Sequence, residues 1–292
     1  MKPAHYLTVI LIAFLAAIVA QKLFPVPSEA AQKTAIAEPA YERLAKTGTL
    51  RCGYIVAPPL FLKDPNSGKF SGIGYDIVTE AAQLMNWKIE WIAESSFGAL
   101  VQDLQSYKFD MLCTPSYIVP NRIGRVQMSK PLYYSGINAY VRVSDTRFDN
   151  NLPAINRPDV TISAVDGTTP MLVASTDFPQ SKLLSLPQNS PYTDSLLNVA
   201  NNKADVTFVE TSIGEGFLQA NPGVLRNITA EKPLRVYPDV FVFPPDEIKM
   251  KNLFDAVFAY MHSNGQIDRI LDKNSQTPGE FYRLPKAFKI NE

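Results

Sequence analysis

One arginine stands out among the residues that could bind a charged ligand. Arg122 follows a short apolar segment, Asp110 to Cys113, and a polar turn, and a new strand is expected beyond it. A guanidinium offers parallel N–H donors that match a carboxylate, so Arg122 is a candidate carboxylate clamp. The alternative is an ordinary surface arginine after a strand, which describes most arginines.

The other side chains exclude several kinds of chemistry. The histidines are His5, in the predicted export signal, and His262, so there is no histidine cluster for a zinc site. A Ser-His-Asp triad is also hard to build from His262 alone. Gly72-Ile73-Gly74 is too short for a dinucleotide fingerprint, and no phosphate-binding glycine loop occurs. We therefore expect no metal and no cofactor. Lys plus Arg balances Asp plus Glu at 28 against 28, which gives no sign of nucleic-acid binding.

The amino terminus reads as an export signal. Lys2 precedes an uncharged, mostly apolar run from Tyr6 to Ala20, which is short for a membrane span. We assign residues 1–30 to a signal peptide or an uncleaved anchor and residues 31–40, rich in Ala, Pro and polar residues, to a linker. The predicted location is the periplasm, with retention by the anchor as the alternative.

The cysteines, Cys52 and Cys113, fall in predicted strands of one lobe. In an oxidising compartment they could pair if those strands are neighbours. We favour two buried free thiols over a disulfide.

Apolar periodicity predicts alternating strands and helices from about residue 41. Expected strands cover residues 50–56, 88–92, 109–113, 137–143, 160–165, 182–186, 206–209 and 235–243. Expected helices cover residues 40–46, 75–85, 98–107, 167–175, 192–201, 212–219, 246–262 and 267–271, with a polar tail from about Ser275.

This order predicts an α/β protein with mostly parallel strands and crossover helices. Ligands bind such sheets at the carboxyl ends of strands, here near residues 55–61, near Phe97 and over 114–122. The repeat of the order predicts two lobes, with 137–236 inserted between 41–136 and 237–292. Two chain crossings then form a hinge with a cleft between the lobes.

Six segments resemble, in order, the extracellular solute-binding proteins that serve amino-acid ABC importers. They are TGTLRCGYIVAPPLF, GKFSGIGYDIVTEAAQLMNWKIEWI, SSFGALVQDLQSYKFD, SAVDGTTPMLV, NNKADVTFVET and HSNGQIDRILDK. The segment around Arg122, which ends in VQMSKPLYYSG, is similar to a signature of the same family. The resemblance implies the two-lobe periplasmic-binding-protein type 2 fold with a two-segment hinge.

The resemblance also implies ligand-binding roles. Arg122 would bind an α-carboxylate, and Thr168 and Thr169 would present free N–H groups at a helix start, although Thr often serves there as a plain N-cap. Glu210 would bind the ligand's amino group, or it is a loop acid or helix cap. Phe97 would stack on the ligand side chain, or it is core packing.

Some positions depart from the family pattern. Tyr117 and Asn121 replace the usual hydroxyl and acid before Arg122, and Pro115, which has no N–H, replaces a small residue. Ser116 or the Tyr117 hydroxyl could substitute. The apolar and aromatic lip favours a hydrophobic or aromatic amino acid, or another small carboxylate, over a strongly basic one.

The resemblance implies a monomeric, non-enzymatic periplasmic protein that delivers an amino acid or small carboxylate to an ABC permease in the inner membrane. One alternative is a sensor or accessory lobe that docks on a membrane or periplasmic partner. Another is a dehydratase on the same fold, in which Glu210 or Asp166 acts as general acid.

Overall fold

The helices and strands alternate along most of the chain, as the sequence predicts. The computed structural model describes residues 38–275 and 280–285, so the predicted export signal and most of the linker lie outside the described residues. Contacts divide the chain between Pro39 and Ala40, and the architecture below concerns residues from Ala40 onward.

The elements up to the long strand β7 are α2 (Ala40–Thr47), β1 (Thr49–Tyr54), β2 (Leu62–Lys63), β3 (Phe70–Ser71), α3 (Ile73–Leu84), β4 (Lys88–Glu94), α4 (Leu100–Gln105), β5 (Met111–Tyr117), β6 (Gln127–Met128) and β7 (Tyr133–Arg142). Those between β7 and the long strand β12 are η2 (Leu152–Ile155), β8 (Thr161–Val165), α5 (Thr169–Asp177), β9 (Lys182–Leu186), α6 (Tyr192–Ala200), β10 (Val206–Glu210), α7 (Thr211–Ala220) and β11 (Leu225–Asn227). The remaining described elements are β12 (Arg235–Phe243), α8 (Ile248–Ser263), α9 (Gln266–Asn274) and β13 (Phe281–Tyr282).

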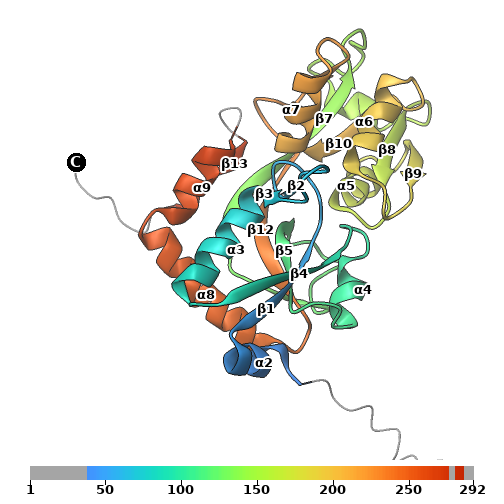
Figure 1. Cartoon of the computed structure of the whole chain (residues 1–292). Coiled ribbons are helices and arrows are strands. Elements are labelled where there is room, and N and C mark those ends of the chain that lie inside the picture. Colours follow the sequence, from blue (N-terminus) through green and yellow to red (C-terminus); the bar gives the residue numbers. More distant parts are fainter. Residues whose placement is uncertain (1–37, 276–279, 286–292) are drawn as a thin grey trace, which may run out of the picture. The chain divides into compact units, whose positions relative to one another are not determined.

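A continuous sheet runs in the order β4-β1-β5-β12-β7-β10-β8-β9 (Figure 1). Parallel pairing joins β4, β1 and β5 at one end and β10, β8 and β9 at the other. Between them, β5, β12, β7 and β10 pair antiparallel. The α/β prediction with a parallel sheet in each lobe is therefore confirmed, and the long strands β7 and β12 join the two lobes.

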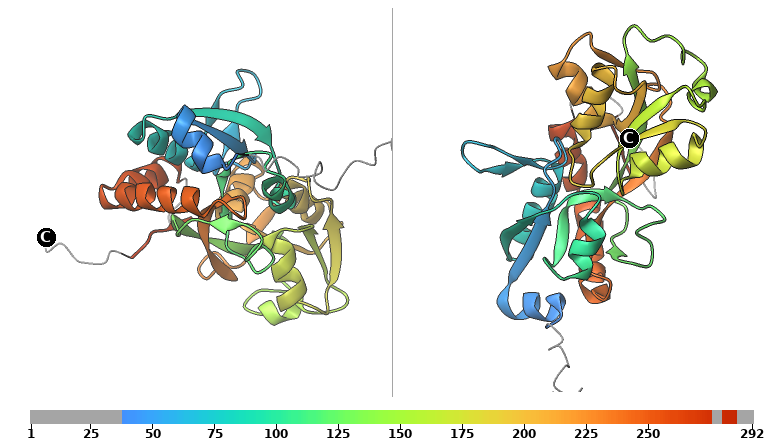
Figure 2. Two further views of the ribbon diagram at one scale, coloured as in Figure 1. Left: turned by 90° about the horizontal axis from the view of Figure 1, so that it is seen from below. Right: turned by 90° about the vertical axis from the view of Figure 1, so that its right-hand side faces the viewer.

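In the first lobe, helices cover both faces of β4-β1-β5. Apolar side chains of α3, α8 and α9, such as Ile77, Phe254 and Leu271, pack with Leu50 of β1 against one face. Leu100 of α4 packs in a second cluster on the other face (Figure 1). Figure 2 shows the β2–β3 hairpin extending away from this layered core.

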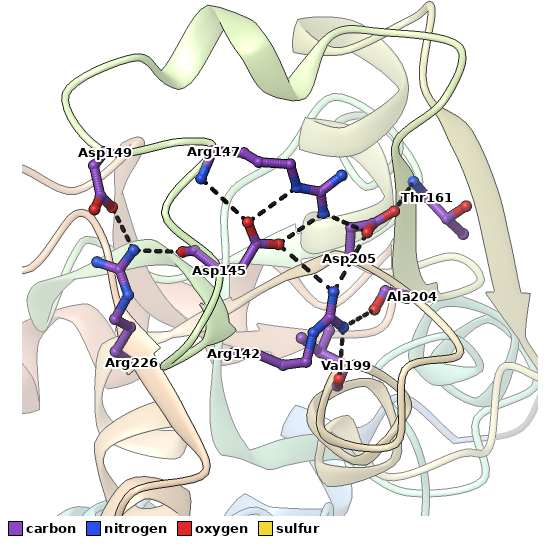
Figure 3. Close-up of polar contacts among 9 residues, drawn as sticks. All are labelled: Arg142, Asp145, Arg147, Asp149, Thr161, Val199, Ala204, Asp205 and Arg226. Carbon is purple, nitrogen blue, oxygen red and sulfur yellow. Dashed lines mark hydrogen bonds and ion pairs between the residues drawn. The ribbon is translucent and has the colours of Figure 1, made fainter.

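In the second lobe, successive side chains of β7 point to opposite faces of the sheet, and each face is covered by helices. Ile137, Ala139 and Val141 face one core with α5, whereas Tyr140 faces another core with α6 and α7. The outer end of β7 is fixed by an ion-pair network (Figure 3). Its members are Arg142, Asp145, Arg147, Asp149, Asp205 and Arg226.

The structure corrects several predicted boundaries. β5 continues to Tyr117, so Ser116 and Tyr117 lie in a buried strand instead of a loop. β7 begins at Tyr133, four residues before its predicted start. The predicted polar tail includes a short strand, in which Phe281 pairs with Ser135 of β7. These boundaries depend on pairing with strands that are distant in the sequence, which local propensity does not encode.

The free-thiol prediction is wrong. Cys52 of β1 and Cys113 of β5 form a disulfide, with their Cα atoms 5.6 Å apart. Because β1 and β5 are parallel neighbours, the two side chains meet inside the first lobe. The sequence could not reveal this adjacency, since it depends on the strand order. The predicted lobe boundaries at residues 136/137 and 236/237 remain a prediction.

Candidate functional site

A small closed cavity lies between the two lobes. Its volume is about 10 Å³, roughly the space that one water molecule occupies. The first lobe contributes residues from β5, from the turn that follows it and from the segment before α4. The second contributes the starts of α5 and α6 and the end of β10, and β7 and β12 complete the wall. The lining residues are Phe97, Pro115, Ser116, Tyr117, Arg122, Ile137, Thr169, Pro170, Tyr192, Glu210 and Asp239.

Arg122 is almost fully buried, at 2% exposure, so it is no ordinary surface arginine. Its Nη1 donates to the Ser116 hydroxyl (2.6 Å) and the Tyr117 carbonyl (2.9 Å), and its Nη2 donates to the Phe97 carbonyl (3.3 Å). All of these acceptors are neutral, and Arg122 forms no ion pair with any residue that the structure describes. Burial lowers the Arg122 pKa to about 10 because it removes the cation from water. The guanidinium thus lacks an anion.

The aromatic ring of Phe97 stacks on Tyr192 from the opposite lobe. The ring centroids lie 5.3 Å apart and the planes are inclined by 27°. Both rings also line a larger groove of about 1050 Å³, which runs past Ile55 to Pro58 and the start of α6. The stacked pair therefore lies where the small cavity, with its buried charged side chains, adjoins a wide and mostly apolar groove.

Two buried acids line the cavity: Glu210 ends β10 and Asp239 lies in β12. Glu210 is 5% exposed and accepts a hydrogen bond from the Ser212 hydroxyl at 3.2 Å. Its pKa is raised to about 7, because burial opposes ionisation more than hydrogen bonds from Tyr117, Ser212 and Ser135 favour it. Burial, followed by the nearby Glu210 charge, also raises the pKa of Asp239.

Tyr117 lies between the cation and the acids. Its carbonyl accepts from Arg122, whereas its hydroxyl is 3.0 Å from the Ser135 hydroxyl, which donates to Asp239 at 2.6 Å. Burial raises the pKa of Tyr117 well above its ordinary value, and the nearby charges of Glu210 and Asp239 raise it further. One tyrosine therefore connects the two oppositely charged parts of the cavity.

The start of α5 lies at the cavity wall. Gly167 adopts a positive φ of 73°, which lets the chain turn sharply from β8 into the helix. Thr168 is the N-cap residue, and its hydroxyl donates to the Val165 carbonyl at 2.6 Å without capping the helix. Thr169 follows as the first helical residue, so its N–H is among those with no intrahelical acceptor.

Six of the seven predicted site residues line this cavity: Phe97, Ser116, Tyr117, Arg122, Thr169 and Glu210. Thr168 lines the adjoining groove. The alternative acid, Asp166, lines neither space and accepts from Ser185. Sequence reasoning missed Tyr192 and Asp239. Asp239 carried a usable signal, namely a charge inside the strand YPDVFVF.

The charges define what the cavity can hold. It has a buried cation without a counter-ion on one side of Tyr117 and two buried acids on the other side. Such a site suits a small ligand that carries both an anionic and a cationic group. Within residues 38–275 and 280–285, no cluster of His, Cys, Asp and Glu could hold a metal ion. No helix in those same ranges combines the length and hydropathy of a membrane span.

The family model described as bacterial extracellular solute-binding proteins, family 3, matches residues 50–277. The chain belongs to this family. The resemblance inferred from the six sequence segments is thereby confirmed. Two curated relatives of this solute-binding protein are 26% identical to it. They are a "Probable histidine-binding protein" of Campylobacter jejuni, over 157 residues, and a "Probable amino-acid ABC transporter-binding protein" of Haemophilus influenzae, over 104 residues.

Those alignments cover 53% and 36% of this chain, and 57% and 40% of the two relatives, so the chain matches about half of their length. Solved structures extend the similarity to the fold. The L-cysteine solute receptor of Neisseria gonorrhoeae has a TM-score of 0.72 at 17% identity, covering 84% of this chain and 100% of the receptor.

A second similar structure is an ancestral amino acid-binding protein described as a precursor of cyclohexadienyl dehydratase. Its TM-score is 0.70 at 22% identity, and the alignment covers 80% of this chain and 97% of the ancestral protein. The two-lobe fold predicted for this family member is confirmed.

Proposed function

We propose that this protein is a periplasmic binding protein that captures a zwitterionic amino acid between its lobes and delivers it to an ABC permease. The observation that carries this proposal is that one cavity contains both the buried Arg122 cation, which has no counter-ion, and the buried acids Glu210 and Asp239. The names of the relatives, which refer to amino acids and ABC transporters, support the same solute class.

The ligand's α-carboxylate binds Arg122, where a bidentate pair replaces the neutral acceptors. Thr169 supplies an N–H at the start of α5, where the helix dipole favours an anion. The ammonium group binds at Glu210. The side chain contacts Phe97 and Tyr192 and extends toward the apolar groove, which favours a hydrophobic or aromatic amino acid.

In this closed arrangement the cavity is small and its mouth is narrowed by side chains of both lobes. Ligand entry therefore requires the lobes to separate about β7 and β12, and binding favours closure because the ligand gains contacts from both lobes. The protein acts as a monomer, and its periplasmic location follows from the export signal together with the extracellular family.

The test uses protein that has been unfolded and refolded to remove any carried ligand. Calorimetric titration compares phenylalanine with 3-phenylpropionate, which lacks the ammonium group, and with phenethylamine, which lacks the carboxylate; the other amino acids follow. We expect micromolar or tighter binding of an amino acid and at least about 100-fold weaker binding of either half, because each half leaves a buried charge unpaired.

Arg122→Met and Arg125→Met form the matched pair of variants, since Arg125 is exposed and lies in the same turn. Only Arg122→Met should lose binding. Failure of every amino acid to bind the folded protein, or equal binding by the two variants, would overturn the proposal.

The pKa of Glu210 favours one second candidate function, a dehydratase. The Glu210 pKa of about 7 suits a general acid, and a similar fold belongs to a precursor of cyclohexadienyl dehydratase. We propose binding without turnover, because the cavity accounts for Glu210 as a ligand for ammonium. Incubation with prephenate, followed by spectroscopic detection of phenylpyruvate, distinguishes the two, and sustained product formation would favour the dehydratase.

A further inference from the structure

Asp239 is an acid in an otherwise apolar part of β12. Its neighbours Val240, Phe241, Val242 and Phe243 are fully buried, and Asp239 itself is 1% exposed. An ionisable side chain in such a strand costs free energy unless a partner offsets its burial. Asp239 lines the cavity, where a bound ligand could offset the cost of its burial.

The hydrogen bonds of Asp239 are incomplete. Oδ2 accepts from the Ser135 hydroxyl at 2.6 Å, whereas Oδ1 is buried and has no donor among the described residues. An acceptor that is buried and unpaired destabilises the folded state, and more so if it is charged. The Asp239 carboxyl group therefore has one oxygen that is hydrogen-bonded to Ser135 and one that has no hydrogen-bond partner among the described residues.

The sheet places Asp239 and Glu210 on either side of β7, and Ser135 of β7 hydrogen-bonds both of them. β12 and β10 both pair with β7, Asp239 opposite Tyr133 and Glu210 opposite Ile137. Residues 133, 135 and 137 point to the same face of β7, so Asp239, Ser135 and Glu210 share that face. After burial, the charge of Glu210 is the next cause that raises the pKa of Asp239. The charges of both acids add to the effect of burial in raising the pKa of Tyr117.

We propose that Asp239 is a specificity-determining residue, a second carboxylate that together with Glu210 binds the ammonium group of the ligand. This inference rests on the proposed function and adds to it a class of ligand. A primary ammonium has three N–H donors, which can serve Asp239 Oδ1 and Glu210 together. A hydroxyl group offers one donor and no charge, and an N-acylated amine offers one donor and no charge, so both leave one carboxylate unpaired.

Ligand binding should also change the protonation of Glu210 and Asp239. The groups facing it are Tyr117 of β5, Tyr133 and Ser135 of β7, Ser212 of α7 and Glu280 before β13, all of them acids or hydroxyls. In the ligand-free protein, burial and mutual repulsion favour a proton on the pair. A bound ammonium favours the charged carboxylates, so binding releases protons near neutral pH and strengthens as the pH rises toward 7.

The test compares Asp239→Asn with Asp255→Asn in calorimetric titrations. Asp255 is a buried acid that accepts from the Lys130 N–H and pairs with Lys251, away from the cavity. The ligands are the tightest-binding amino acid and its α-hydroxy acid, each measured in buffers of different ionisation enthalpy. We expect the wild type and Asp255→Asn to prefer the amino acid and to release protons on binding it.

Asp239→Asn should bind the amino acid about 10- to 100-fold more weakly, bind the hydroxy acid almost unchanged and release fewer protons. An unchanged preference and unchanged proton release in Asp239→Asn would overturn the proposal, because they assign Asp239 a purely structural role. If the variant does not fold, the pH dependence of the wild type is the test. Affinity of the wild type for the amino acid that does not change between about pH 5 and pH 7 would also overturn the proposal for Asp239. Absence of amino-acid binding by the wild type would instead refute the proposed function.

Discussion

Gly98 and Gly167 meet across the cleft, one from each lobe. A Cβ on Gly167 would lie 3.2 Å from the Gly98 Cα. A Cβ on Gly98 would lie 2.8 Å from the Asp166 carbonyl oxygen and 2.7 Å from the Gln188 Cβ, both in the second lobe. These separations leave no room for a side chain at Gly98, so the closed arrangement of the lobes depends on this glycine next to Phe97.

The first prediction is that Gly98→Ala weakens ligand binding about tenfold or more, because the added methyl group holds the lobes apart and overpacking costs about 1–3 kcal/mol. Gly98 does not have a positive φ, so alanine fits its backbone and the free energy of unfolding of the open protein should change little. Calorimetric titration and urea denaturation measure the two quantities. Gly216→Ala is the control, because a Cβ there meets nothing within 4 Å. Equal affinities in the two variants would contradict the prediction.

The second prediction concerns the pH dependence of stability. The Glu210 pKa is raised to about 7, so between about 4.5 and 7 the unfolded state loses a proton that the folded state keeps. The free energy of unfolding should therefore fall as the pH rises through this range, by up to about 3 kcal/mol from Glu210, and level off above it. The raised pKa of Asp239 acts in the same direction.

Thermal unfolding of the ligand-free protein across this pH range checks that prediction. Glu210→Gln should remove the share of the slope that Glu210 contributes, whereas Glu231→Gln, at an exposed position, should keep the wild-type slope. Equal slopes in the wild type and in Glu210→Gln would show that Glu210 is ionised in the folded state across this range.

The third prediction concerns the ion-pair network in Figure 3. Asp145 accepts from Arg147 Nε at 3.0 Å and Nη2 at 2.7 Å and is largely buried, and the hydrogen bond from Arg147 lowers its pKa. Asp145→Asn should reduce the free energy of unfolding by about 2 kcal/mol at neutral pH. The difference should vanish as the pH falls through the lowered pKa of Asp145, since the carboxyl is then protonated in the wild type as well.

Asp159 provides the matched comparison for Asp145. It also accepts two hydrogen bonds from one arginine, Arg157, but both side chains are mostly exposed. Asp159→Asn should therefore reduce the free energy of unfolding much less than Asp145→Asn does in urea denaturation. Equal costs for the two variants would mean that burial adds nothing to the Asp145 interactions.

The fourth prediction concerns the disulfide. Cys52 and Cys113 are separated by 61 residues, and closing a loop of this length stabilises the folded state by up to about 4 kcal/mol. Replacement of both by alanine should lower the urea midpoint, and reduction of the wild type should lower it similarly. Reductant should not affect the double variant. A wild type that is insensitive to full reduction would refute the expected stabilisation.

The α/β class, the family and most of the cavity wall could be predicted from local sequence patterns. Arg122, Glu210 and Phe97 were predictable because their segments resemble family motifs and lie at or near strand ends, where ligands bind such sheets. Local signals of this kind need only neighbouring residues, and the structure brings these three side chains to one cavity.

Which distant residues join these three depends on how the strands pair and how the lobes meet. Asp239 reaches Glu210 because β12 and β10 both pair with β7, and Tyr192 reaches Phe97 because the lobes close. The disulfide and the pairing of Phe281 with Ser135 likewise depend on strand order. Burial sets the charge balance of the cavity, and burial is a sum over segments far apart in the chain, which no local pattern encodes.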